Sequence, residues 1–415
     1  MHLFVTIPAI NELDFIMGVL SDLSNQQSKN FTLVCCVNQP DSWWDDEKYV
    51  EICHNNVSTM EQIDSFCKLK NIPLILIDKC SKGKGWKGKE CGVGWARKVL
   101  MDHVSKIASD DDIIVSLDAD TRVEANYIAE IEKQFTVFTM ASAMALPYFH
   151  RLQGKDAQKT SMLRYEIYLR CYAINLLRID FPFAYTPIGS AMAARVSAYR
   201  KIRGLTATSS GEDFYFMMKL RKIGVIIPFC NTTVYPSSRV SNRVIFGTGP
   251  TVGMEADAQA AKYPVYSPDL FDEINKACAA FGEIFFTNSE KAMDKALKVF
   301  PDLEPEKLLK NNPSLIRFIH ACYIKADAFA VYKYVKSNYT QSSDASSVQT
   351  LFKMLNYNCE NLFLENTELH HQPIENLKKI RQILYEIEEN LLKKKYNDYF
   401  AQRNNLKNPL WKFMS

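Results

Sequence analysis

Long apolar runs are missing from this sequence, and no stretch approaches the roughly 18 residues that a membrane-spanning helix needs. Its 11 cysteines contain no Cys-x-x-Cys pair, which argues against a disulfide framework and against a structural zinc site built from cysteines. The net charge of +3 is too small to indicate nucleic-acid binding. No basic leader precedes the first apolar run, so the sequence predicts a cytoplasmic protein without a signal peptide or transmembrane segment.

Glycine is nearly absent from the second part of the chain. Of the 15 glycines, 14 precede residue 254 and only Gly282 follows, and helical patterns dominate the remainder. One apolar stripe at spacings of three and four runs from Ile374 to Leu391. We therefore expect one domain at residues 1–255 and an α-helical domain at residues 256–415. Residues 408–414 mix basic and aromatic side chains. Two interpretations of this segment remain open, a peripheral membrane contact and a docked or frayed terminus.

Short apolar runs alternate with helical patterns in the first domain. Such alternation predicts an α/β fold with a mostly parallel sheet and helices on both of its faces. The runs that we interpret as strands are residues 3–7, 31–37, 73–77, 113–117 and 143–146.

Two carboxylates, Asp118 and Asp120, lie at the end of the fourth of these runs. Ligands of open α/β sheets bind beyond the carboxyl ends of the strands. In an extended chain alternate residues point the same way, so both side chains would face one cation, and Mg²⁺ or Mn²⁺ prefers such oxygen ligands. An acidic turn after a strand explains the same pair, so the motif alone leaves both interpretations open.

A glycine turn precedes these carboxylates, and a second acidic pair follows them. Residues 92–94 read Gly-Val-Gly, and Arg97 lies at the start of the helix expected next, where free N–H groups and a guanidinium suit a phosphate. Glu212 and Asp213 open another expected helix, where acidic residues also complement the helix dipole without any catalytic role. The basic residues 82–89 form either a solvated loop or a lid that meets a diphosphate.

Taken in this order, these blocks resemble glycosyltransferase family 2, over roughly the first 250 residues. Each block is similar to one of the family's motifs. They are residues 5–12 for the opening strand and nucleotide loop, 92–98 for the Gly-x-Gly-x-Ala-Arg-Asn block with Lys98 in place of Asn, 116–121 for the Asp-x-Asp block, 189–195 with 203–205 for the donor-sugar and acceptor segment, and 211–213 for the Glu-Asp block.

The resemblance implies a GT-A fold, which is Rossmann-like, followed by a helical domain for acceptor binding or oligomerisation. It implies a metal-dependent inverting glycosyltransferase that moves a hexosyl or similar sugar from a nucleoside-diphosphate sugar to a hydroxyl acceptor, in glycan or glycoconjugate biosynthesis. Asp213 would be the catalytic base with Glu212 beside it, and Asp120 with Asp118 would hold Mn²⁺ or Mg²⁺. The residues expected to bind the nucleotide sugar are Pro8, Asn11, Glu12, Gly94, Arg97, Asp118, Arg195, Arg239 and Arg243.

Two departures from the family pattern narrow these expectations. Asn38 ends the second strand where the family often has an acidic turn that reads the nucleotide base, so the base is left open. The Gln-x-x-Arg-Trp block of processive synthases is missing, and Arg239 and Arg243 stand in that region beside glycines 247 and 249. A single-addition enzyme is therefore expected, with the two arginines over the donor diphosphate.

Two other functions remain open. A sugar nucleotidyltransferase also combines a basic glycine loop with a metal carboxylate, but its loop follows the first strand, where residues 8–12 here carry no glycine or lysine. A non-catalytic scaffold on a GT-A frame is the third hypothesis. A dinucleotide oxidoreductase is disfavoured because no Gly-x-Gly-x-x-Gly follows the first strand. The seven histidines form no ligand pattern, and His150 is interpreted as structural.

Overall fold

The computed structural model describes residues 1–415 except 89, 209–210, 240–250, 341, 360 and 405–415. The described chain forms two compact units, one of residues 1–158 and 187–253, the other of residues 159–186 and 254–415. Helix α5 (Asp156–Arg178) lies almost wholly in the second unit, although strands of the first unit precede and follow it in the sequence. The expected domain boundary at residue 255 stays a prediction, and the two units are described separately.

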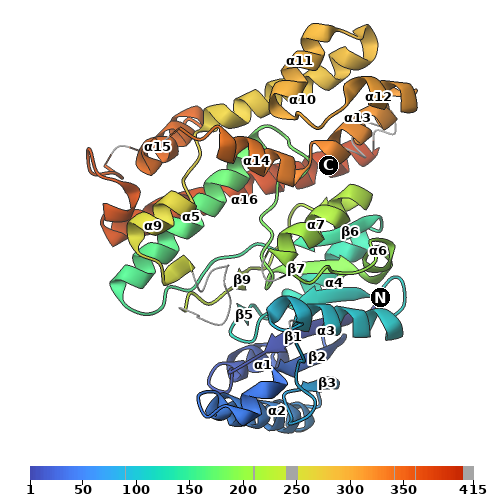
Figure 1. Cartoon of the computed structure of the whole chain (residues 1–415), viewed down its shortest axis with the longest axis vertical. Helices are drawn as coiled ribbons and strands as arrows, with labels where there is room; N and C mark the ends of the chain where they lie inside the picture. Colours follow the sequence, from blue (N-terminus) through green and yellow to red (C-terminus); the bar gives the residue numbers. More distant parts are fainter. Residues whose placement is uncertain (89, 209–210, 240–250, 341, 360, 405–415) are drawn as a thin grey trace. The chain divides into compact units, whose positions relative to one another are not determined.

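A seven-stranded sheet forms the centre of the first unit (Figure 1), in the order β3-β2-β1-β4-β7-β6-β8. The neighbours around β1 are parallel, and so are β6 and β8, whereas β7 runs antiparallel to both β4 and β6. The strands are β1 (Leu3–Ala9), β2 (Phe31–Asn38), β3 (Leu74–Lys79), β4 (Ile113–Ser116), β6 (Ala141–Ala145), β7 (Met192–Arg195) and β8 (Val225–Ile227). A separate ribbon pairs β5 (Arg122–Val123) with β9 (Val234–Tyr235).

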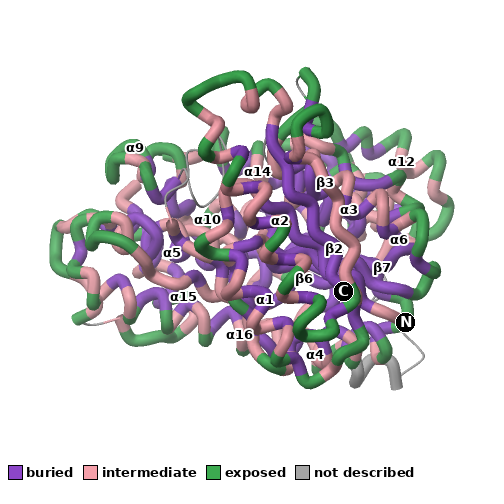
Figure 2. The backbone as a smooth tube through the Cα atoms, turned by 90° about the horizontal axis from the view of Figure 1, so that it is seen from below, coloured by how far each residue is buried: buried purple, intermediate pink, exposed green. Residues whose placement is uncertain are grey.

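Helices flank this sheet along its length. Helix α3 packs against β1 and β2, α2 against β2 and β3, and α6 and α7 against β6. β1 and β4 are buried throughout, and this buried centre appears in purple in Figure 2. The helical elements of the unit are α1 (Ile16–Ser24), η1 (Asp41–Asp45), α2 (Val50–Lys70), α3 (Val93–Ile107), α4 (Tyr127–Val137), α6 (Val196–Lys201) and α7 (Glu212–Ile223). The expected α/β fold with a mostly parallel sheet is confirmed.

The second unit is helical in its described residues. Buried Leu377, Ile380 and Leu384 confirm the apolar stripe expected on the last helix. A buried ion network joins that helix to α5, because Arg170 donates to Glu166 and, over 2.5 Å, to Glu388. The elements after α5 are α9 (Ala256–Lys262), α10 (Pro268–Thr287), α11 (Glu290–Val299), α12 (Pro305–Asn311), α13 (Leu315–Lys325), α14 (Ala328–Ser337), α15 (Asp344–Met354), η2 (Leu369–His371) and α16 (Ile374–Asn404).

Across the described helices of both units, none combines the length and apolar character that crossing a bilayer requires.

Candidate active site

Arg97 joins two of the acidic blocks. Its guanidinium donates one hydrogen bond to Glu212 and another, over 2.6 Å, to Asp118. The Arg97 side chain is 6% exposed and that of Glu212 is 5% exposed, so this contact is buried, whereas Asp118 at 36% is open to solvent. Because both carboxylates face it, the pKa of Arg97 lies above its ordinary value although burial opposes this. A charge-assisted fork thus fixes the start of α7 to the end of β4.

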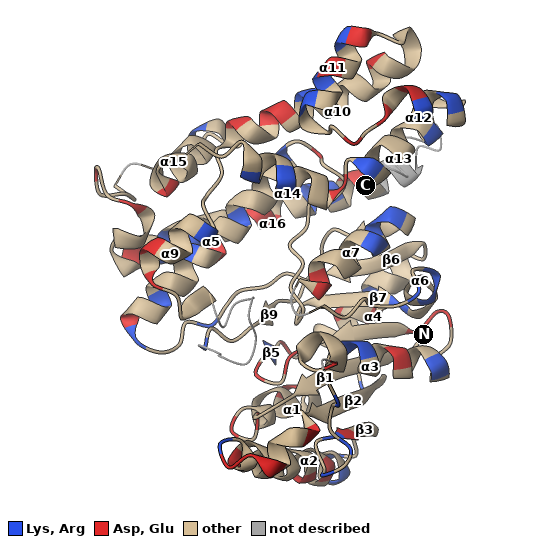
Figure 3. Ribbon diagram, in the orientation of Figure 1, with Lys and Arg blue, Asp and Glu red and all other residues tan. Residues whose placement is uncertain are grey.

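Local backbone geometry positions these side chains. Gly92, with φ 98°, caps α3, and Gly211, with φ 71°, caps α7, which are conformations that glycine adopts without strain. Figure 3 marks the acidic start of α7 in red. A Cβ on Gly94 would stand 2.6 Å from the carbonyl oxygen of Thr208, so only glycine lets the start of α3 approach that backbone so closely.

Gly189 holds three parts of the site together. Its carbonyl oxygen accepts a hydrogen bond of 2.7 Å from the Ser116 hydroxyl at the end of β4. Its backbone also makes a hydrogen bond to Asp213, which lowers the pKa of that carboxyl. A Cβ on Gly189 would lie 2.5 Å from the guanidinium carbon of Arg97. The Arg97 side chain therefore occupies the space that any larger residue at position 189 would need.

Gly189→Ala is expected to displace Arg97 from Asp118 and Glu212, because the fork cannot move without leaving one carboxylate unpaired. Overpacking of this kind costs about 1–3 kcal/mol. Urea unfolding would measure the loss. Gly282→Ala is the matched control, since a Cβ there meets no atom within 4 Å in α10, and this change is expected to be neutral or stabilising. Equal behaviour of the two variants would contradict the packing role of Gly189.

Asp213 follows Glu212 in the first turn of α7 and has a perturbed acidity. Burial raises the pKa of its carboxyl from 3.8 to about 6, the neighbouring Glu212 charge raises it as well, and Arg97 opposes both. Its Oδ1 accepts the N–H of Phe214 over 2.8 Å. A carboxylate with this pKa is ionised at neutral pH and still a better proton acceptor than an ordinary aspartate.

A second cluster surrounds Asp120. Arg239 donates from Nε to Asp120 over 2.5 Å and from Nη2 to Glu12, while its guanidinium carbon lies 4.1 Å from the centre of the Phe15 ring. Arg151 donates to the backbone oxygen of Asp120, also over 2.5 Å. The loop after β1, the Asp-x-Asp block and the segment before residue 240 therefore converge at Arg239, which binds both Glu12 and Asp120.

The expected extended conformation of the Asp118–Asp120 segment is wrong. β4 ends at Ser116, and the Thr121 N–H donates to the Asp118 carbonyl over 3.1 Å, which closes a turn. The two carboxylates consequently engage different arginines, since Asp118 binds Arg97 and Asp120 binds Arg239. Within the described residues the second oxygen of each carboxylate has no hydrogen-bond partner, so both can still serve a hard cation such as Mg²⁺ or Mn²⁺.

The structure does not bring every expected residue to this group. Arg195 pairs with Ile113, the first residue of β4, and donates to the carbonyl oxygens of Ala141 and Phe135, so it lies at the opposite end of the strand from Asp118. We therefore do not propose Arg195 as a donor-binding residue. Arg243, with the glycines at 247 and 249, lies outside the described residues.

Pro8 and Asn11 lie at and beyond the carboxyl end of β1, next to Glu12. Pro8 pairs with Cys36 of β2, and Asn11 turns the chain with a φ of 54° and donates its backbone N–H to Asn56 over 2.7 Å. Their contacts are with β2 and α2, and a role for them at a nucleotide stays a prediction.

The basic stretch 82–89 is tied down in its described residues. The Asp41 carboxylate accepts the Gly83 N–H, Lys84 binds Asp78 over 2.8 Å, and the indole N–H of buried Trp86 donates to Asn38 over 3.0 Å. Asn38 stands where the resembled family often has an acidic residue. Its side chain donates to the Ala9 carbonyl oxygen and accepts from Trp86, so it is engaged within the protein. These contacts favour a docked loop over a freely moving lid.

Sequence reasoning missed two residues of the Asp120 cluster. Arg151 lies a few residues after a strand in a mostly apolar and aromatic stretch, and Phe15 precedes a helix as one of 24 phenylalanines. Neither belongs to a motif, and only their distances to Asp120 and Arg239 reveal them.

The comparisons with known proteins bear on this same region. Residues 113–264 match the family described as Glycosyl transferase family group 2, and this segment holds the Asp118, Asp120, Glu212 and Asp213 blocks. The resemblance inferred from the sequence is thereby confirmed. A search of curated proteins found no relative.

Solved structures of S. aureus TarS are also similar. TarS 1–349 in complex with UDP-GlcNAc aligns at 12% identity over 87% of this chain and 93% of its own, with a TM-score of 0.38. TarS 1–349 in complex with UDP aligns at 12% identity over 90% of this chain and 98% of its own, also with a TM-score of 0.38. TarS 1–349 alone aligns at 14% identity over 92% and 90%, with a TM-score of 0.36. Similarity at this level does not identify a substrate.

Proposed function

We propose that this chain, of which residues 113–264 match a glycosyltransferase family, moves a sugar from a nucleoside-diphosphate sugar to an acceptor hydroxyl, with inversion and with a divalent metal. The observation that carries the proposal is the Arg97 fork, which holds the Asp118 and Glu212 carboxylates in one cluster with Asp213 beside them. In this proposal Asp213 is the base, Arg97 the cationic anchor and Asp118 a metal ligand, and their proximity supports transfer to a hydroxyl.

Asp213 is the proposed base. Its raised pKa of about 6 lets it take the proton of the attacking hydroxyl while remaining ionised at neutral pH. Attack by a hydroxyl held at this carboxylate, on the face opposite the leaving diphosphate, inverts the anomeric carbon. Glu212 is a positioning residue, because it is buried on Arg97 and cannot meet an acceptor without breaking that pair.

The leaving diphosphate would be received by cationic groups of this chain. Arg239 is 19% exposed and binds the carboxylates of Asp120 and Glu12, so its guanidinium can exchange a carboxylate for a phosphate. Asp118 and Asp120 would hold Mg²⁺ or Mn²⁺ through their remaining oxygens, and the ion would supply charge stabilisation at the departing phosphates. The base, the sugar and the acceptor are not assigned.

The donor site is tested by thermal melting with UDP, GDP, dTDP and CDP, each with and without Mn²⁺. A ligand that binds the folded protein raises its melting temperature. At a ligand concentration of 100 Kd the free energy of unfolding rises by about 2.7 kcal/mol. We expect one nucleotide to act only with Mn²⁺, and Asp120→Ala to lose the shift while Asp64→Ala, an exposed acidic position on α2, keeps it. No shift with any nucleotide would favour the scaffold alternative, and release of pyrophosphate from a nucleoside triphosphate and a sugar phosphate would favour a nucleotidyltransferase.

The pH profile of the wild-type enzyme gives a second test. Asp213 must be ionised to accept a proton, so kcat/KM is expected to fall tenfold per pH unit below the carboxyl pKa of about 6 and to level off above it. Initial rates between pH 5 and 8 with a fixed metal concentration measure this. A profile that stays flat down to pH 5 would exclude a base with this pKa.

A further inference from the structure

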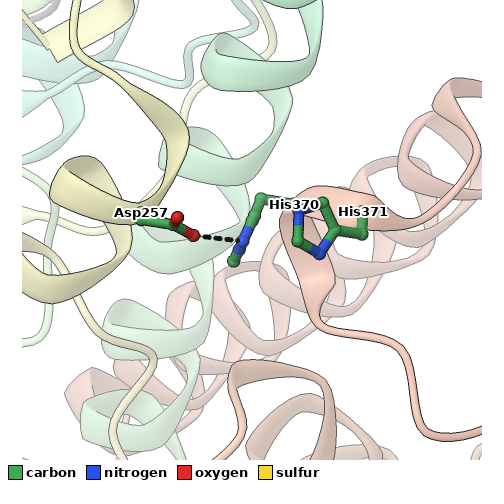
Figure 4. A group of neighbouring side chains, drawn as sticks. All are labelled: Asp257, His370 and His371. Atoms are coloured by element: carbon green, nitrogen blue, oxygen red, sulfur yellow. Dashed lines mark ion pairs between the residues drawn. The ribbon is translucent and has the colours of Figure 1, made fainter.

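A second group of potential metal ligands lies in the helical unit, apart from every residue used above. Asp257 of α9, with His370 and His371 of η2, offers one ligand atom each, and these atoms all lie within 4.8 Å of one another. Figure 4 shows the Asp257 carboxylate facing His370, with His371 adjacent. From these three side chains we propose a zinc site that joins α9 to η2.

His370 carries the first argument. Its side chain is only 7% exposed, yet within the described residues neither ring nitrogen makes a hydrogen bond. Its Nε2 lies 2.9 Å from the Asp257 carboxylate, a contact at hydrogen-bond distance but without hydrogen-bond direction. Buried ring nitrogens almost always have a hydrogen-bond or metal partner. A bound metal ion would be such a partner for the His370 ring.

The arrangement of the other two ligands suits an ion. His370 and His371 have ring centroids 4.2 Å apart at an angle of 54°, so the rings are tilted rather than stacked. Asp257 is 90% exposed and His371 is exposed, which leaves the group open to solvent on one side. Three protein ligands with an open position are a common form of zinc coordination.

The donor atoms select the type of metal. Two imidazole nitrogens and one carboxylate oxygen suit zinc and the neighbouring late transition metals, whereas Mg²⁺ and Ca²⁺ prefer oxygen ligands throughout. This group is thus chemically distinct from the carboxylates of Asp118 and Asp120.

Hydrogen bonds hold both sides of the group in place. Gln372, buried directly after the two histidines, donates to the carbonyl oxygens of Leu364 and Thr367 and so fixes the loop that carries them. Arg164 of α5 donates to the Tyr263 carbonyl over 2.8 Å and thereby holds the end of α9. A zinc ion would add a cross-link between two segments that are far apart in the sequence.

The test is zinc binding by the full chain after removal of metals with a chelator, measured by competition with a chromophoric zinc indicator. We expect one tight zinc equivalent in the wild type, and a loss of affinity of about tenfold or more in His371→Ala and in Asp257→Asn. Both residues are exposed, so these changes leave the core intact. Glu255→Gln beside Asp257 and His103→Ala in the other unit are matched controls and should bind zinc as the wild type does.

Two further readings complete the experiment. Cobalt in place of zinc should give visible absorption bands with the wild type that disappear in His371→Ala. Nucleotide-dependent melting shifts should be the same in wild type and His371→Ala, which separates this proposal from the proposed function. Wild-type affinity for zinc in both ligand variants, or no tight equivalent in the wild type, would overturn the site.

Discussion

Asp213→Asn is expected to lower the transfer rate by about 10²–10⁴-fold while the donor still binds, because the amide cannot accept the proton of the acceptor hydroxyl. The substitution preserves the size of the side chain and its hydrogen bond from Phe214. Initial rates with saturating donor measure the first effect, and nucleotide-induced melting shifts measure the second. The expected pattern is a loss in kcat with an unchanged donor affinity.

Stability distinguishes this catalytic effect from damage to the fold. The folded protein holds the pKa of the Asp213 carboxyl above its ordinary value, so the stability from its protonated form is present at low pH and is lost as pH rises through about 6. At neutral pH the ionised carboxylate therefore costs stability, and Asn removes that cost. An unchanged or higher melting temperature is expected, with Asp64→Asn on α2 as the exposed control. Retained turnover, or lost donor binding, would contradict the assignment of the base.

Arg97→Met is expected to destabilise the protein by about 3–5 kcal/mol, because it leaves the buried Glu212 carboxylate without its cation. In a unit of this size the loss corresponds to a fall in melting temperature on the order of 10 °C. Urea and thermal unfolding measure it. Transfer activity is expected to disappear as well, since Asp118 and the start of α7 lose their common anchor.

The matched control is Arg122→Met, which removes an arginine that also grips a carboxylate with two nitrogens, at Asp22. Arg122 is 44% exposed and Asp22 is 13% exposed, and because the arginine reaches solvent we expect this pair to contribute about 1 kcal/mol. Arg97→Lys adds a second comparison, because a lysine keeps the charge but not the planar fork. If Arg97→Met and Arg122→Met cost the same, the fork is not the anchor that we propose.

Local patterns were sufficient for much of the fold. The apolar runs predicted strands that the structure contains as β1, β2, β3, β4 and β6, and the stripe on α16 is buried as expected. These patterns depend only on which face of a strand or helix is buried, and residues close together in the sequence encode that face. The boundaries shifted by a few residues where hydrogen-bond pairing, rather than apolarity, ended a strand, as at Ser116.

Motif order predicted which residues belong to the candidate site, and their roles stay predictions, but it did not predict which of them contact one another. Motif order identified Arg97, Asp118, Asp120, Glu212 and Asp213, and the family match covers all but the first of these. Arg195 carried the same motif-based expectation, yet its strand runs antiparallel to β4 and delivers it to the far end. Strand direction depends on the path of the chain through the whole sheet, which no local pattern contains.

By itself, the sequence determined the alternation of strands and helices, the helical character of the second part and the resemblance to a glycosyltransferase family that residues 113–264 match, because all three are carried by residue periodicity and by short motifs. Only the tertiary structure decided which charges meet. The Arg97 fork, the Arg239 contact with Asp120 and Glu12, and the group of Asp257 with two histidines each join segments far apart in the chain. Their partners are set by packing of distant backbone, so only distances in the folded chain could reveal them.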